Sequence, residues 1–262
     1  MKLQNKVIVV TGAGSGIGRA LVERFTREEA AALVAVDIDR EAVEALAQQC
    51  GCTAMTADVS VEADVARVIE DAEQTYGPID LFCSNAGVAA GASEQSLNSE
   101  WEFSWHVNVM SHVYAARHLV PRMVERGSGY LLNTASAAGL LNQVGGAAYG
   151  VTKHAAVGFA EWLSMTYAHK GIKVSVLCPQ AVRTAMTMTD SDSEMVQAAA
   201  TDGMMEAGEV ADIVVEHIDR EAFLILTHPE VKTYLERKAS DYDRWIGGMN
   251  KLHRHLSGEL SR

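Results

Sequence analysis

A glycine-rich turn between an apolar run and a helical segment is the feature that most restricts how this chain can fold. Residues 6–11 have the pattern of a buried strand, the turn from Gly12 to Gly18 follows, and a helical pattern begins at Arg19. Glycines at such a junction permit a tight turn and let the backbone approach a pyrophosphate, which then lies at the helix N-terminus. A glycine-rich turn with no ligand is the alternative for the glycines alone.

Further strand-like runs recur along the chain, with helical segments between them. The runs comprise residues 7–10, 32–36, 53–56, 81–84, 130–133, 173–177 and 222–226. Continuous apolar strands that alternate with helices are typical of a parallel sheet covered on both faces. We therefore expect an α/β fold with one Rossmann-type, doubly wound parallel sheet of about seven strands. The 262 residues fit a single such domain over 1–262.

Three segments outside the sheet carry their own signals. Ser99 and Glu102 have the spacing of a capping box, and residues 106–125 are predicted to form one long helix. Residues 184–208 mix five methionines with small polar residues and are expected to form a substrate lid. Residues 229–262 are expected to form a helical tail whose apolar stripe is interrupted at Gly247 and Gly248. This stripe either packs on the core or covers a second subunit.

The second strand run ends in Asp37, where the ribose of a dinucleotide would lie. Its carboxylate can accept a hydrogen bond from a ribose 2′-hydroxyl and would repel a 2′-phosphate, so NAD is predicted over NADP. The alternative is an aspartate that only caps the following turn.

Tyr149 and Lys153 lie four residues apart, which places both side chains on the same face of a helix. The pKa of an unperturbed tyrosine is about 10, and a neighbouring cation lowers it. A phenol made acidic in this way can take a proton from an alcohol at neutral pH. Ser136 follows another strand run, and its hydroxyl can bind the oxygen of an alcohol or of a ketone.

Gly12 to Gly18, Asp58, Asn85-Ala86-Gly87, Asn108, Ser136, Tyr149 and Lys153 together resemble the short-chain dehydrogenase/reductase family in order and spacing. The resemblance covers about residues 6–184. It implies that Tyr149 is the general acid/base, that Lys153 lowers its pKa and binds the nicotinamide ribose, and that Ser136 holds the substrate oxygen. It also implies that Asn108 holds a water that links Lys153 to solvent.

The same resemblance implies a cofactor site. Its residues are Gly12, Ser15, Gly16, Ile17, Gly18, Asp37, Ile38, Asp58, Val59, Asn85, Ala86, Gly87, Tyr149, Lys153, Pro179, Val182 and Thr184. Gln180 departs from the family pattern, which usually has a glycine after Pro179.

The expected substrate residues are Ser136, Val144, Tyr149, Met186 and Met188. Apolar side chains dominate the segments that should shape the pocket, and Arg183 is the one cation in them. We therefore expect a neutral, fairly hydrophobic secondary alcohol or ketone as substrate. A reductase of β-ketoacyl or sugar substrates and a non-catalytic NAD-sensing protein are the alternatives.

Charge and cysteine content exclude several other classes. Lys and Arg number 22 against 34 Asp and Glu, a net charge of −12, and no basic cluster of the nucleic-acid type occurs. The sequence contains neither a signal-peptide pattern nor an apolar run of membrane-spanning length, so a cytoplasmic protein is expected. The four cysteines do not have zinc-site spacing, and no metal is assigned. A homotetramer or homodimer is expected from the resemblance.

Overall fold

The structure is a computed structural model that describes residues 1–189 and 191–259. Over these residues, seven strands form one parallel sheet in the order β3-β2-β1-β4-β5-β6-β9. The strands are β1 (Val7–Thr11), β2 (Ala32–Asp37), β3 (Thr53–Thr56), β4 (Leu81–Ser84), β5 (Gly129–Thr134), β6 (Ile172–Cys178) and β9 (Leu224–Leu226). A separate short parallel pair, β7 (Val182–Arg183) with β8 (Met205–Glu206), was not expected. The predicted doubly wound sheet is confirmed.

The order of the strands reverses at β1, which lies between β2 and β4. Val9 is opposite Val34 on β2 and Phe82 on β4. In open α/β sheets, ligands bind beyond the carboxyl ends of the strands at such a switch point. This topology therefore places the glycine-rich turn and the residues that follow β2 and β4 around one crevice.

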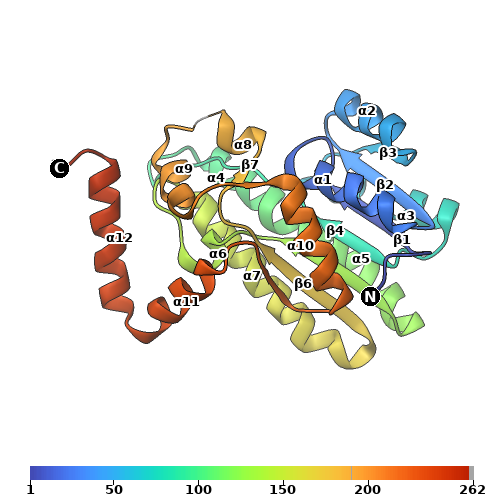
Figure 1. Cartoon of the computed structure of the whole chain (residues 1–262). Helices are drawn as coiled ribbons and strands as arrows, with labels where there is room; N and C mark the ends of the chain where they lie inside the picture. Colours follow the sequence, from blue (N-terminus) through green and yellow to red (C-terminus); the bar gives the residue numbers. More distant parts are fainter. Residues whose placement is uncertain (190, 260–262) are drawn as a thin grey trace.

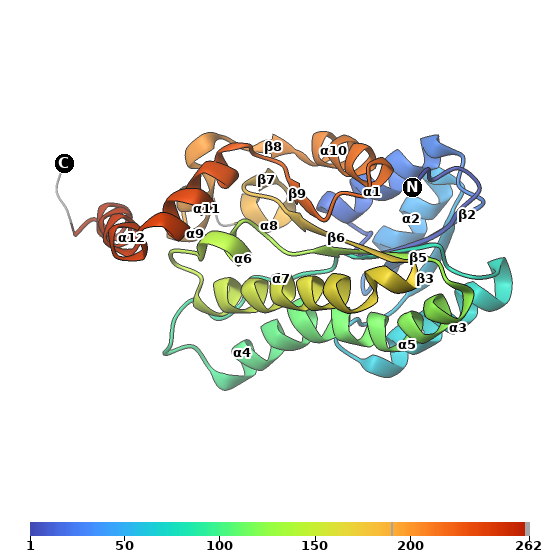
Figure 2. The same ribbon diagram turned by 90° about the horizontal axis from the view of Figure 1, so that it is seen from below.

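Helices cover both faces of the sheet, as Figure 2 shows. One face packs on α1 (Gly16–Phe25), α2 (Arg40–Cys50) and α10 (Ala207–Asp219), and the other on α3 (Glu62–Tyr76), α5 (Ser111–Arg126) and α7 (Ala147–Tyr167). Because successive side chains of a strand point to opposite faces, Ile8 and Val10 enter one apolar core and Val7 and Val9 enter the other. Short helical turns η1 (Thr26–Glu28), α6 (Ala138–Leu141) and η3 (Ala168–Lys170) complete these layers.

The segment before α5 differs from the sequence prediction. A helix α4 (Asn98–Trp105) runs into the π-helical turn η2 (His106–Met110), which continues as α5, so residues 106–125 are not one regular helix. The predicted capping box at Ser99 is also wrong. The Glu100 carboxylate accepts the Leu97 N–H at 2.9 Å, and the helix begins at Asn98. This glutamate satisfies the first turn although the preceding leucine has no side-chain acceptor.

The C-terminal tail forms α11 (Glu230–Ser240) and α12 (Tyr242–Leu256), and α12 extends away from the sheet (Figure 1). The helix continues through Gly247 and Gly248, which interrupt only its apolar stripe. The chain bends at Asp241, whose carboxylate accepts the Arg244 N–H at 3.0 Å and caps α12. Residues 260–262 of the predicted tail lie outside the described residues.

The predicted lid folds into α8 (Ala185–Met188), α9 (Glu194–Ala199) and the short turn η4 (Ala200–Asp202). Asp190 of this segment lies outside the described residues. Among the helices of the described chain, none has the length and apolar character needed to cross a membrane.

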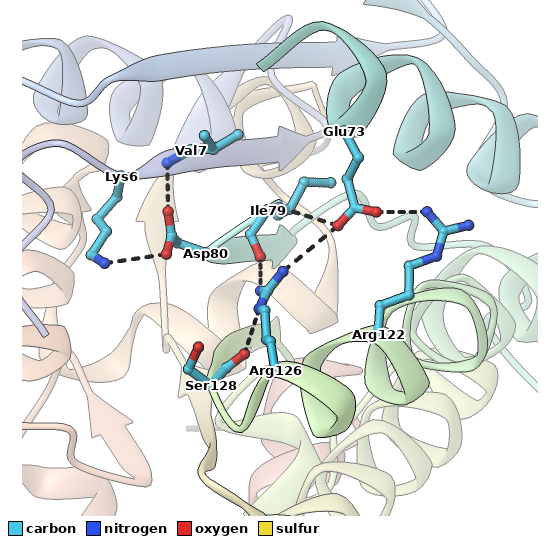
Figure 3. Close-up of polar contacts among 8 residues, drawn as sticks. All are labelled: Lys6, Val7, Glu73, Ile79, Asp80, Arg122, Arg126 and Ser128. Carbon is cyan, nitrogen blue, oxygen red and sulfur yellow. Dashed lines mark hydrogen bonds and ion pairs between the residues drawn. The ribbon is translucent and has the colours of Figure 1, made fainter. Parts of the chain in front are cut away.

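Polar side chains tie the opposite, amino-terminal end of the sheet together (Figure 3). Asp80 accepts the Val7 N–H at 2.9 Å and lies 3.2 Å from the Lys6 ammonium. Figure 3 shows a second group, in which Glu73 accepts the Ile79 N–H at 3.2 Å and pairs with Arg122 at 2.6 Å. Arg126 donates to the backbone carbonyls of Ile79 and Ser128. These contacts fix the loops between β1, β4 and β5 at the end farthest from the crevice.

Candidate active site

A cavity of about 340 Å³ opens at the carboxyl ends of the strands. The glycine-rich turn, the ends of β2 and β4, and the start of α7 form its wall. It contains most of the predicted cofactor residues, namely Gly12, Ser15, Gly16, Ile17, Asp37, Ile38, Asp58, Val59, Asn85, Ala86, Gly87, Tyr149, Lys153, Pro179, Val182 and Thr184. The topology thus brings together residues that are up to 172 positions apart in sequence, from Gly12 to Thr184. Their contacts with a cofactor remain predictions.

The glycine-rich turn has the shape needed for close backbone approach. Gly12 has a φ of +67° and Gly16 a φ of +53°, values that residues other than glycine rarely adopt. A Cβ on Gly12 would lie 2.7 Å from the Ala86 Cα. Gly18 is the predicted cofactor residue that does not line the cavity. A Cβ at this position would lie 2.0 Å from the Gly12 carbonyl oxygen. Its contribution is tight packing of turn on helix, so the turn fits a dinucleotide pyrophosphate.

Asp37 is held at the end of β2 by backbone donors. One carboxylate oxygen accepts the Gly14 N–H at 2.7 Å and the other accepts the Asp39 N–H at 2.9 Å. Both oxygens retain further acceptor capacity, since an ionised carboxylate accepts about four hydrogen bonds. Capping of α2 is performed by Asp39, which accepts the Ala42 N–H at 3.1 Å. Asp37 thus caps the turn after β2, as the alternative predicts, and its contact with a ribose hydroxyl stays a prediction.

Lys153 lies one helical turn after Tyr149, as the spacing predicts, and its side chain is buried. Its ammonium donates to the Thr134 carbonyl at 3.1 Å and lies 5.6 Å from the centroid of the Tyr149 ring. Burial lowers the pKa of Lys153 to about 8, because desolvation disfavours the charged form.

The pKa of Tyr149 differs from the expectation. Burial raises it above its usual value, and the Ser136 hydroxyl acts in the opposite direction to a smaller extent. The sequence predicts that the Lys153 cation supplies part of a lowered pKa, and this prediction leaves out the cost of desolvating a phenolate. Burial of the phenol thus opposes the phenolate that the proposed proton transfer needs.

Ser136 is buried just after β5. Its hydroxyl accepts the Ala138 N–H at 3.1 Å and donates to the Pro179 carbonyl at 3.3 Å. Of the predicted substrate residues, Ser136 and Val144 line a second cavity, whereas Tyr149 and Met186 line the first.

Met188 lies in neither of these two cavities. It is exposed, and its sulfur is 3.8 Å from an Arg183 guanidinium nitrogen. Arg183 is itself paired with Glu206 at 2.8 Å.

Asn108 lies in the π-helical turn and does not line the cavity. Its side-chain amide accepts the Val88 N–H and donates to the Val88 carbonyl, both at 2.9 Å, and also donates to the Thr152 hydroxyl at 3.0 Å. A Cβ on Gly87 would lie 3.2 Å from the Lys153 ammonium and 3.3 Å from the Asn108 amide oxygen. Asn108 therefore holds the segment after β4 against Lys153. The water expected at this residue remains a prediction.

The second cavity has a volume of about 330 Å³ and extends from Ser136 to the tail helices. Gln180 lines both cavities. Its side-chain nitrogen donates to the Ala199 carbonyl at 3.0 Å and to Asp202 at 2.8 Å, and its oxygen is buried without a partner among the described residues. The residue that departs from the family pattern thus connects the end of β6 with the predicted lid.

The sequence predicts no site residue in the tail, yet α11 and α12 form one wall of the second cavity. The wall residues from these helices are Tyr234, Arg237, Trp245, Met249 and Leu252. The apolar spacing of the last three was visible in the sequence, but the surface opposite them was not. The described residues contain no group of three or more metal-ligating side chains, and the expected absence of a metal remains a prediction.

Known proteins are similar to this chain over most of its length. A family model described as short chain dehydrogenase matches residues 6–195. The 1-deoxy-11-beta-hydroxypentalenate dehydrogenase of Streptomyces exfoliatus is 36% identical over 259 residues, covering 94% of this chain and 91% of that protein. The 3beta-hydroxysteroid dehydrogenase 2 of Eggerthella lenta is 34% identical over 210 residues, covering 77% of this chain and 80% of that protein.

A solved structure shows the same likeness in three dimensions. The short chain dehydrogenase/reductase from Burkholderia phymatum in complex with NAD has a TM-score of 0.86 and 29% sequence identity. The match covers 93% of this chain and 96% of that one.

Proposed function

The chain belongs to the short-chain dehydrogenase/reductase family, and from this premise we propose that it is an NAD-dependent oxidoreductase that interconverts a secondary alcohol and its ketone. The observation that carries the proposal is the grouping of Tyr149 and Lys153 in the wall of a cavity that also contains the glycine-rich turn. Ser136 lies at the neighbouring cavity.

Each of these residues has a task in the proposed reaction. NAD, when bound, accepts the hydride that leaves the carbinol carbon. The Ser136 hydroxyl orients the substrate oxygen, and the Tyr149 phenol oxygen takes the hydroxyl proton in oxidation or returns it in reduction. Lys153 favours the phenolate by its charge. Asn108 keeps Gly87 and Val88 in place beside that ammonium.

The preference for NAD over NADP rests on Asp37. Its carboxylate lines the cavity at the end of β2, where it would accept a hydrogen bond from a ribose hydroxyl and repel a phosphate. The relative from Burkholderia phymatum, solved with NAD, supports the same choice of cofactor.

The proposed substrate is a fairly hydrophobic secondary alcohol or ketone, which the sequence predicts to be neutral. Val144 and Met186 supply apolar walls, and Arg183 is engaged by Glu206. The names of the two relatives, a hydroxypentalenate and a hydroxysteroid dehydrogenase, fit a fairly hydrophobic alcohol. Residues 184–208 are proposed as the lid. Homo-oligomerisation and a cytoplasmic location remain predictions.

The test is Tyr149→Phe, which removes the phenol oxygen and little volume. We expect kcat to fall by about 10²-fold or more, the usual contribution of a positioned acid/base, while NAD affinity stays within about threefold. NADH absorbance with a panel of secondary alcohols measures the first quantity, and calorimetry with NAD measures the second. Tyr167→Phe, at the far end of the same helix and in neither cavity, is the control.

Retention of a tenth or more of wild-type kcat in Tyr149→Phe would refute the assignment. A protein that binds NAD but oxidises no alcohol and reduces no ketone would instead be the non-catalytic NAD sensor. Turnover confined to β-ketoacyl or sugar ketones would favour the reductase alternative.

A further inference from the structure

An apolar stripe on α12 faces a cavity instead of a packed core. Trp245, Met249 and Leu252 recur at positions i, i+4 and i+7, which lie on one face of a helix. All three line the second cavity, and each is only half-buried. No described residue of α12 is fully buried. An apolar ligand in this cavity would remove the stripe from water, which is worth about 25 cal/mol per Å² of apolar surface.

The charge of this cavity contrasts with that of the whole molecule. Arg237 is the one charged residue in its described wall, although the chain carries a net charge of −12. The guanidinium lies 5.9 Å from the centroid of the Tyr234 ring, and among the described residues it has no carboxylate partner. The nearby Asp202 accepts the Tyr234 hydroxyl at 2.9 Å and the Gln180 amide at 2.8 Å, and it does not line the cavity.

The second cavity shares a wall residue with the cavity of the proposed reaction site. Ser136 belongs to its wall, and Gln180 is shared with the cavity that contains Tyr149. A substrate whose oxygen is held by Ser136 can therefore extend toward α11 and α12. Along this direction it would meet the apolar stripe and Arg237.

On the basis of the proposed function, we propose that the second cavity is the distal part of the substrate site and binds an apolar skeleton carrying a carboxylate, which pairs with Arg237. An arginine fork matches the geometry of a carboxylate and forms charge-assisted hydrogen bonds with it. The preferred substrates are then hydroxy acids, with the carbinol at Ser136 and the anion at the tail, and not the neutral alcohols that the sequence predicts.

Matched pairs of hydroxy acids and their methyl esters test the proposal. The series runs from 4-hydroxycyclohexanecarboxylate to 12-hydroxyoctadecanoate, so that the distance between carbinol and carboxylate varies. At one separation we expect kcat/KM to favour the acid by tenfold or more. Arg237→Met should reduce this acid-to-ester ratio at least tenfold, mainly through KM, and Arg237→Lys should keep part of it.

Arg244→Met is the matched control. Arg244 also lies in the tail, its side chain has no partner within the described part of the chain, and it is absent from the cavity wall. Its substitution should leave the acid-to-ester ratio within twofold of wild type. An equal loss for acid and ester in Arg237→Met, or a preference for the ester at every separation, would overturn the proposal.

Fluorescence of Trp245 provides a readout that does not need turnover. Titration with the acid should change the emission saturably in the wild type, and the change should be lost in Trp245→Phe and weakened in Arg237→Met. If the acid binds but no alcohol is turned over, the proposed carboxylate site is supported and the proposed oxidoreductase activity is refuted. Absence of both signals would overturn the site itself, as expected if a second copy of the chain covers the stripe.

Discussion

At the residue scale, the site buries Lys153, and burial disfavours the charged form of its side chain. Burial lowers the pKa of Lys153 to about 8, below the value of about 10.4 of an unfolded lysine. Between these two pH values the unfolded chain binds more protons than the folded one, so this group makes stability rise with pH across that window. At neutral pH the buried charge is thus a cost to folding. Such costs are typical of catalytic sites.

Asp37 is the residue on which cofactor choice depends. Asp37→Asn removes the negative charge and keeps an oxygen that can accept the Gly14 N–H. We expect the ratio of kcat/KM with NAD to kcat/KM with NADP to fall at least tenfold, because repulsion of the 2′-phosphate is lost. Steady-state kinetics with both cofactors measures the ratio.

Asp39→Asn is the control for this substitution. That carboxylate is two residues away but caps α2 and does not line the cavity. An unchanged ratio in Asp37→Asn, or an equal change in Asp39→Asn, would show that cofactor choice does not depend on Asp37.

At the element scale, the π-helical turn η2 connects α4 and α5 and carries Asn108. π-Helical turns are frequent at functional sites, because they redirect a side chain without ending the helix. Here the turn places the Asn108 amide where it binds both backbone groups of Val88. The turn thereby couples a helix on one face of the sheet to the loop after β4.

Asn108→Ala should weaken this coupling. The Val88 N–H and carbonyl lose their partner, at a cost of about 2 kcal/mol in the free energy of unfolding. We expect kcat to fall at least tenfold as well, because Gly87 is no longer held beside Lys153. Urea denaturation and NADH absorbance measure the two effects.

Thr152→Val is the comparison for Asn108→Ala. It removes one hydrogen bond of the same amide and the bond from the Thr152 hydroxyl to the Tyr149 carbonyl, and it leaves both bonds to Val88. It should cost less than about 1 kcal/mol and change kcat by less than threefold. If both variants behave alike, the Val88 contacts are not what supports the site.

The elements differ in how well their sequences predict them. The strands were placed within a residue or two, because continuous apolar runs bounded by polar or glycine residues have few alternatives. The start of α4 was misplaced because Leu97 has no capping side chain and only Glu100 signals the turn. The π-helical turn depends on how Asn108 packs against Val88, which local sequence does not encode.

The same contrast holds for the site. The glycines, Asp37, Tyr149 and Lys153 follow a chain-order pattern, and all of them but Gly14 and Gly18 line one cavity. The contribution of Arg237 depends on where α11 packs, which is set by contacts between segments about a hundred residues apart in sequence. The Lys238 ammonium, for example, donates to the Leu140 carbonyl at 2.6 Å and so fixes α11 on α6.

At the scale of the whole molecule, the two ends of the sheet have different tasks. The carboxyl end holds the cavities, the unpartnered Gln180 oxygen and the buried Lys153, all of which cost stability. The amino end holds a network in which Glu73, Arg126 and Asp80 connect α3, α5 and the loops before β1 and β4. This arrangement predicts that stability can be changed at one end while catalysis at the other is preserved.

Glu73→Gln tests that separation. Glu73 is largely buried, accepts the Ile79 N–H and pairs with Arg122 and Arg126, so loss of its charge should cost about 2 kcal/mol in the free energy of unfolding. Because none of these residues lines either cavity, kcat and KM should stay within twofold of wild type. Glu70→Gln is the control, since Glu70 is exposed on the same helix and only 4.0 Å from Arg122, so it should cost less than about 0.5 kcal/mol. A large loss of kcat in Glu73→Gln at a temperature where the variant is folded would show instead that the two ends are coupled through the sheet.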